Sequence, residues 1–145
     1  MLRTVLLTAA LAVGATAVLA QGDPIATRKQ TMKGVGEATK TGSAMAKGEA
    51  PFDPAKAKEI IQVYANAADK MHNYFPENSK TGGETTAAPT IWQNQAEFRK
   101  RFDDWAAEIK AAAAHTNNLD SFKAAFGNLT KACGGCHETF RIKKS

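Results

Sequence analysis

Two cysteines and a histidine near the end of the chain are the residues whose spacing most clearly suggests chemistry. Cys133, Cys136 and His137 lie in the stretch KACGGCHETFRIKK, and the chain has no other cysteine. On a helix, positions i, i+3 and i+4 share one side, so these three side chains would point in one direction. The spacing C-x-x-C-H is the attachment signature of c-type haem, with two thioether bonds to the porphyrin and an imidazole on the iron.

Three other uses of the cysteine pair compete with haem attachment. A thioredoxin-like redox pair begins a helix in a βαβ unit, which the apolar pattern of this chain does not indicate. A structural zinc site needs four ligands, and beyond the cluster only His72, His115 and carboxylates remain. A disulfide across three residues inside a helix is poorly placed geometrically. The spacing therefore favours haem.

Two glycines separate the cysteines inside an otherwise apolar helical pattern. Gly134 and Gly135 weaken a helix, and their lack of side chains would leave room for a porphyrin edge. The alternative is that they mark a frayed last turn. Gly34, Gly36 and Gly42 in the first predicted helix allow the close approach of another helix or of a flat ligand.

The start of the chain has the pattern of a cleavable secretory signal. Arg3 precedes an uninterrupted run of apolar and small residues that ends in VLA before Gln21. A retained membrane anchor is the alternative, but the run is short and lacks a charged stop-transfer flank. We therefore expect residues 1–20 to be a signal peptide, residues 21–145 to form one domain, and the mature protein to be periplasmic, without membrane insertion.

The charge of the chain is mildly basic and evenly spread. The formal net charge is +5, of which Arg3 supplies one. Lysines alternate with acidic residues rather than forming a basic stripe with interleaved aromatics, so no nucleic-acid partner is expected. The basic tail RIKK is the local exception, and with the scattered lysines it could guide docking to an acidic redox partner.

Capping signals and apolar spacing predict four helices. Asp23 with Pro24 and Asp53 with Pro54 open the first two, the third begins near Pro89, and Asp120 caps the fourth. Four such helices bury their apolar stripes best as an all-α antiparallel bundle, a fold that builds cofactor sites from facing helices. The stripes comprise Ile25, Met32, Val35 and Met45; Ala57, Ile60, Ile61, Tyr64, Ala68, Met71 and Phe75; Ile91, Phe98, Phe102, Trp105 and Ile109; and Phe122, Phe126, Leu129, Cys133, Cys136 and Phe140.

With these features together, the chain resembles the cytochrome c′ class of c-type cytochromes and its low-spin relatives. The resemblance runs through RKQTMK, AMAKGE, KTGGETTAAPTIW and the C-terminal motif, and so covers essentially the whole mature chain. It implies one covalent haem c anchored by Cys133 and Cys136, with His137 as proximal iron ligand. It also implies a homodimer as the expected assembly.

Three further residues gain roles from the resemblance. Arg28 would lie near a haem propionate, and Met32, one turn later, would face the distal side of the iron. Arg141 would tune the proximal histidine, although a cation favoured by the helix dipole is the plainer interpretation. For Met32 the plainer interpretation is core packing.

Met32 separates two forms of the family. If it does not bind iron, the haem is five-coordinate and its apolar distal face suits NO and CO. If it does, the haem is six-coordinate and suits electron transfer. Neither form is an enzyme in the strict sense. A contrasting hypothesis is a cofactor-free helical binding or scaffold protein, which would purify colourless.

Overall fold

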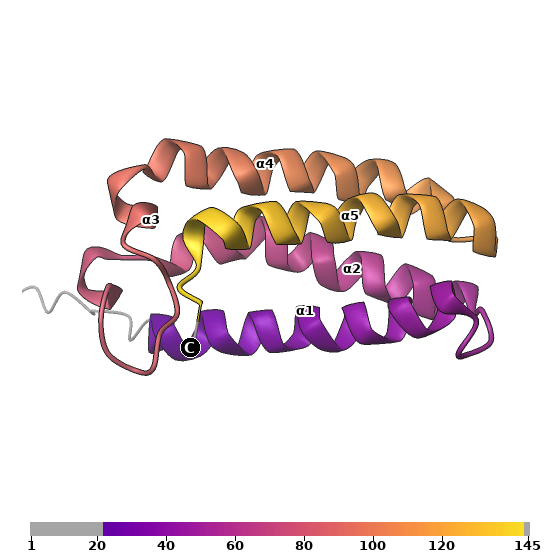
Figure 1. Cartoon of the computed structure of the whole chain (residues 1–145), viewed down its shortest axis with the longest axis horizontal. Coiled ribbons are helices and arrows are strands. Elements are labelled where there is room, and N and C mark those ends of the chain that lie inside the picture. Colours follow the sequence, from indigo (N-terminus) through magenta and orange to yellow (C-terminus); the bar gives the residue numbers. More distant parts are fainter. Residues whose placement is uncertain (1–21, 144–145) are drawn as a thin grey trace, which may run out of the picture.

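A computed structural model describes residues 22–143, so the predicted signal peptide lies outside the described residues. Four long helices lie side by side (Figure 1), packed in the order α1, α2, α4 and α5 around one core. Within residues 22–143 no strand forms, and the prediction of an all-α four-helix bundle is confirmed. The helices are α1 (Pro24–Lys47), α2 (Pro54–Lys70), a short α3 (Thr90–Gln93), α4 (Gln95–Ala112) and α5 (Leu119–Phe140), with 3-10 turns at Met71–Tyr74, Glu77–Ser79 and Ala113–His115.

The predicted caps of the first two helices are confirmed. The amide of Ile25 donates to Asp23 Oδ1 at 2.9 Å, and the amide of Ala55 donates to Asp53 Oδ1 at 2.8 Å. In both helices a proline follows the cap, where its missing N–H costs no helical hydrogen bond. Helix α1 ends at Gly48, whose φ of 76° is the left-handed conformation that glycine accepts most easily.

The start of the third helix near Pro89 is confirmed, but that helix is interrupted, and the predicted cap of the fourth was wrong; asparagines act as caps at both places. The third helix does not run continuously from Pro89: Asn94 ends α3 and its side chain accepts the Glu97 amide at 3.3 Å, which starts α4. Helix α5 is capped by Asn118 rather than Asp120, since Asn118 Oδ1 accepts the Ser121 amide at 3.0 Å. Asp120 instead lies in the first turn, where a carboxylate suits the helix dipole.

The end of the second predicted helix also differs. Its α-helical part stops at Lys70, and a 3-10 turn over Met71–Tyr74 carries the chain to Phe75 and Pro76. Met71 is nevertheless buried, as its place in the apolar stripe predicts, while Phe75 is only half-buried. The tighter turn ends α2 early and begins the long connection to α3.

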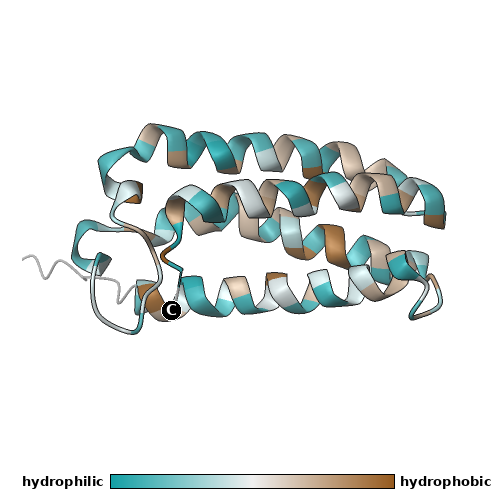
Figure 2. Cartoon of the chain, viewed as in Figure 1, coloured by the Kyte–Doolittle hydropathy of each residue, from teal (hydrophilic) through white to brown (hydrophobic). Residues whose placement is uncertain are grey.

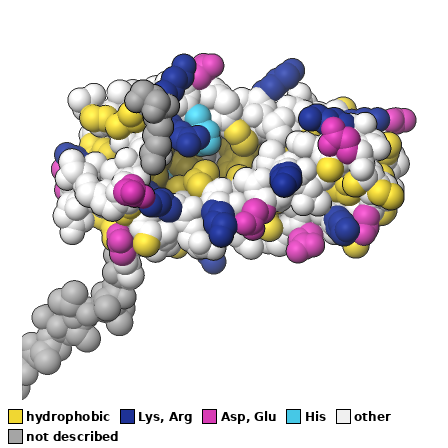
Figure 3. All heavy atoms as spheres, turned by 60° about the horizontal axis from the view of Figure 1, so that its bottom comes forward, with side chains coloured by type: hydrophobic (Ala, Val, Ile, Leu, Met, Phe, Trp, Pro, Cys, Tyr) yellow, Lys and Arg dark blue, Asp and Glu magenta, His cyan; other side chains and the backbone are white. Residues whose placement is uncertain are grey.

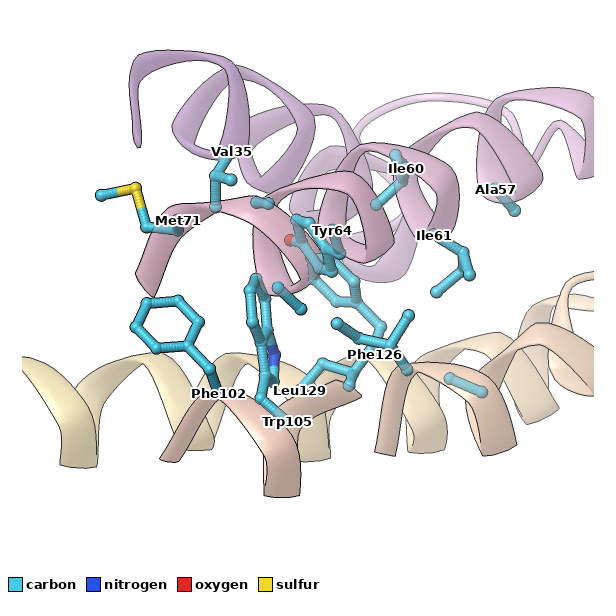
Figure 4. Packing of buried hydrophobic residues seen from close by; sticks show 14 of the residues in the cluster. Val35, Ala57, Ile60, Ile61, Tyr64, Met71, Phe102, Trp105, Phe126 and Leu129 are labelled. Carbon is cyan, nitrogen blue, oxygen red and sulfur yellow. The ribbon is translucent and has the colours of Figure 1, made fainter. Parts of the chain in front are cut away.

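Aromatic side chains fill the centre of the bundle. Tyr64 and Leu129 are fully buried, and the rings of Tyr64 and Trp105 lie 5.4 Å apart, pointing toward one another (Figure 4). Helix α1 approaches α5 closely at Gly42, where a methyl group would overlap the ring of Phe126. Hydrophobic positions recur at intervals along each helix between hydrophilic ones (Figure 2). The predicted stripes are therefore confirmed, although Met32, Phe75, Cys133 and Cys136 are only half-buried.

Candidate haem site

The second half of α5 brings the predicted anchor residues together. Cys133, Cys136 and His137 lie in its last two turns, and all three are half-buried. The two thiols are not joined in a disulfide, and Cys133 Sγ donates to the carbonyl of Leu129 at 3.3 Å. Within residues 22–143 no group of three or more His, Cys, Asp or Glu residues is placed to hold a metal ion.

Burial sets the protonation of these groups. It raises the pKa of the Cys133 thiol, and it raises that of Cys136 against an opposing effect of the Arg101 charge. Burial, and after it the charge of Arg141, lowers the pKa of His137. A lowered pKa keeps the imidazole neutral near neutral pH, which is the form that binds a metal.

The space beside this half of α5 suits a flat apolar group. The interface between α1 and α5 is the sparsest of the four between neighbouring long helices. A side-chain carbon added at Gly134 or Gly135 would meet no atom within 4 Å. Figure 3 shows a hollow with a hydrophobic floor on the side formed by these helices, and a histidine at its edge. The residues present therefore fit a porphyrin held from α5.

Two aromatic residues with polar groups, Tyr64 and Trp105, lie side by side in the core. Tyr64 is fully buried, its hydroxyl lies 2.6 Å from Thr39 Oγ1, and burial raises its pKa to about 12. The hydrogen bond with Thr39 opposes this rise, and a negative charge on Cys133 contributes to it. The indole nitrogen of neighbouring Trp105 is buried and makes no hydrogen bond within the described part of the chain.

Met32 and its neighbours on α1 face the core to different degrees. Met32 is half-buried and packs against the central hydrophobic cluster, while Val35 is buried within it. Ile25 is buried as well, but its side chain contacts the loop at Gly83. The prediction that Met32 lies beside an iron stays a prediction.

Arg28 lies in a set of contacts that its predicted role does not account for. Four of its five N–H donors engage the connection between α2 and α3: they reach the Tyr74 carbonyl, the hydroxyl and carbonyl of Ser79, and Thr85 Oγ1, at 2.6–3.1 Å. The fifth donor of Arg28, Nε–H, makes no hydrogen bond to any residue in 22–143. Sequence reasoning missed Ser79 and Thr85, because nothing in their spacing marks them as partners of an arginine about fifty residues away.

The same connection secures the end of α5. The Ala88 amide donates to the Phe140 carbonyl at 3.0 Å, and the Thr90 hydroxyl donates to the Thr139 carbonyl at 2.7 Å. Arg141 is exposed and its backbone forms an isolated antiparallel bridge with Ala87. The last turn of α5, which carries His137, is thus held by a distant segment (Figure 1).

Comparison with known proteins identifies relatives along the whole chain. The sequence profile of the family described as cytochrome C′ matches residues 23–141. Cytochrome c′ of Rhodopseudomonas palustris is 40% identical over 144 residues, which cover 99% of both chains. Cytochrome c-556 of the same organism is 34% identical over 148 residues, again covering 99% of both.

A solved structure agrees. The structure of cytochrome c′ from Rhodopseudomonas palustris superposes with a TM-score of 0.82 at 43% identity, covering 86% of this chain and all of that chain. Within the described residues, no helix combines the length and apolarity needed to cross a bilayer.

Proposed function

The chain belongs to the cytochrome c′ family and binds one covalent haem c, and on that premise we propose that its iron is five-coordinate and open to small diatomic gases. Cys133 and Cys136 would form the thioether bonds, and His137 would be the proximal ligand. The haem would supply a reversible one-electron couple and one free coordination position for NO or CO.

One observation carries the five-coordinate form: Met32 packs against the hydrophobic cluster of the bundle. A thioether engaged in core packing acts as a wall of the distal pocket rather than as a ligand. The side chains of Met32 and Val35 have no hydrogen-bond donor, so this wall favours uncharged diatomics over polar ligands.

A six-coordinate electron-transfer cytochrome is the second candidate. Met32 has the soft thioether that commonly binds haem iron and raises its reduction potential. The 34% identity to cytochrome c-556 along the whole chain also supports this candidate, because the chain is similar both to a cytochrome c′ and to a cytochrome c-556.

The remaining parts of the proposal concern location and partners. The signal-like pattern of residues 1–20 supports export to the periplasm. There the protein would exchange electrons or capture gas without turning over a substrate. The exposed Arg141 and Lys143 near the end of α5 suit an acidic redox partner, whose docking would weaken as salt rises. A homodimer is the expected assembly.

The optical spectrum of the reduced protein, before and after CO, tests the two candidates together with Met32→Leu. In the five-coordinate form, the native protein is high-spin and binds CO, and Met32→Leu changes CO affinity by no more than about tenfold, because the volume is nearly conserved. In the six-coordinate form, the native protein is low-spin and resists CO, and Met32→Leu converts it to a high-spin form that binds CO. Met45→Leu, a fully buried methionine of the same helix, is the matched control.

The anchor residues have a separate test. Cys133→Ser combined with Cys136→Ser is expected to abolish covalently bound pigment, measured by haem staining of the denatured protein. His137→Ala is expected to change the spectrum of the bound haem while leaving covalent attachment possible. A native protein that purifies colourless when coexpressed with haem-attachment enzymes would favour the cofactor-free scaffold.

A further inference from the structure

Arg28 is a buried charge without an ion pair in the described chain. Its residue is 4% exposed, and every hydrogen bond it donates goes to a neutral oxygen. A buried charge is costly unless hydrogen bonds satisfy it, so four bonds in fixed directions indicate a site built around the guanidinium. All four acceptors belong to residues 74–85, so the hydrogen bonds of Arg28 fix this segment against α1.

Aromatic rings complete the enclosure of Arg28. The guanidinium carbon lies 4.8 Å from the ring centroid of Phe75 and 5.9 Å from that of Trp92. The Trp92 indole in turn donates to the Phe75 carbonyl at 3.0 Å. Phe75 lies at the start of the connection between α2 and α3, and Trp92 lies in α3. The guanidinium therefore makes cation–π contacts with rings at both ends of this segment.

A short series of contacts leads from Arg28 to the end of α5. Thr85 Oγ1 accepts from Arg28 at 2.6 Å and from the Ala87 amide at 3.2 Å. Ala87 forms the antiparallel bridge with Arg141. Beside it, the Ile142 amide donates to the Thr86 carbonyl at 2.8 Å.

We propose that Arg28 is a positioning residue for His137: it orders residues 74–88, and this segment fixes the last turn of α5. The part that concerns iron rests on the proposed function, in which His137 is the proximal ligand. The planar guanidinium donates to four acceptors, and a lysine ammonium, a point charge with three donors, cannot replace it. This role differs from contact with a propionate, for which Arg28 retains only Nε–H.

The test compares the haem-loaded protein with its Arg28→Lys variant by two measurements. The first is hydrogen exchange at the Ala88 and Ile142 amides, which report the junction between the segment and α5; exchange is expected to quicken about tenfold or more. The second is the iron–histidine stretching band in the resonance Raman spectrum of the reduced protein, which is expected to shift or broaden. Arg99→Lys, on the exposed face of α4, is the matched control and should leave both unchanged.

A second variant keeps the test informative if Arg28→Lys does not fold. Ser79→Ala removes one acceptor of the guanidinium and should produce a smaller change of the same sign in both measurements. Unchanged exchange at Ala88 and Ile142 in the folded variants would overturn the proposal. Faster exchange with an unchanged stretching band would overturn the positioning of His137 while leaving the hold on the segment. A native protein without haem would instead refute the proposed function, and exchange would still test the hold.

Discussion

The two halves of α5 differ in how they are held. In the first half, Phe122, Phe126 and Leu129 are at most 5% exposed, and the neighbouring Asn118 caps the helix. In the second half, Cys133 and Cys136 are half-buried, glycines separate them, and the last carbonyls accept hydrogen bonds from residues 88–90. The first half is secured by local capping and close packing, and the second by the buried Phe140 at its end together with long-range hydrogen bonds.

This difference shows that protein side chains fill the space beside the first half of α5 more fully than the space beside Cys133 and Cys136. Around Phe126 there is no spare space, since even a methyl group at Gly42 would overlap its ring. At the half-buried Gly135 an added carbon would meet no atom within 4 Å, and the buried Trp105 indole nitrogen lacks a hydrogen-bond partner among residues 22–143. The buried ring of Phe140 and the hydrogen bonds from residues 88–90 fix the end of α5 without filling the space beside Gly135.

The largest expected effect comes from filling the closed half. Gly42→Val should reduce the free energy of unfolding by about 3 kcal/mol, because the added side chain must displace the buried ring of Phe126. Urea unfolding followed by circular dichroism measures the change.

Gly36→Val is the matched control on the same helix. Gly36 is exposed, and an added carbon there meets no atom within 4 Å, so the free energy of unfolding should change by less than about 0.5 kcal/mol. Equal effects at the two glycines would contradict the close packing of the first half of α5.

The next largest expected effect concerns Tyr64, whose ring packs beside the first half of α5. Its ring is 6.5 Å from that of Phe126, and burial raises its pKa from 10.0 to about 12. The unfolded chain therefore loses this proton first as pH rises, so the contribution of Tyr64 is full below pH 10 and is lost toward pH 12. The loss is at most roughly 3 kcal/mol.

Tyr64→Phe should flatten this alkaline fall in stability, measured by urea unfolding of the haem-loaded protein at a series of pH values. The variant should also be about 1 kcal/mol less stable at neutral pH, because the phenol donates to Thr39, whose own hydroxyl donates to the Val35 carbonyl. Tyr74→Phe, at a half-buried tyrosine, is the control and should retain the full slope. A slope that survives Tyr64→Phe would assign the alkaline transition to other groups.

The smallest effect tests the local cap of the first half. Asn118→Ala should cost about 1 kcal/mol of unfolding free energy, because the Ser121 amide loses its acceptor. Asp120→Ala should cost no more than about 0.5 kcal/mol, since Asp120 contributes only through the helix dipole. Thermal unfolding of the two variants under one condition ranks them, and the reverse order would restore Asp120 as the cap.

Sequence reasoning succeeded where the physical cause is local. The Asp-Pro pairs at the starts of α1 and α2 determine their own geometry, and apolar spacing identified the buried stripes because helical periodicity requires it. The C-x-x-C-H motif brought Cys133, Cys136 and His137 to one helix end for the same reason.

It failed where neighbours compete or where partners are distant. Asn118 and Asp120 are both good caps, and only the fold shows which one faces the free amides. The hydrogen bonds of Arg28 go to Ser79 and Thr85, more than fifty positions along the chain, and no sequence motif marks these hydroxyls as its partners. Apolar spacing reveals which side of a helix is inside, but it does not reveal which polar group a buried charge will find.

The hydrogen bond between Thr90 and Thr139 also bears on the order of folding, because its partners lie 49 positions apart. Contacts of such separation must overcome loop-closure entropy and tend to form after the local turns of each helix. The last turn of α5 is therefore expected to become fixed later in folding than the helical hydrogen bonds of α5 itself.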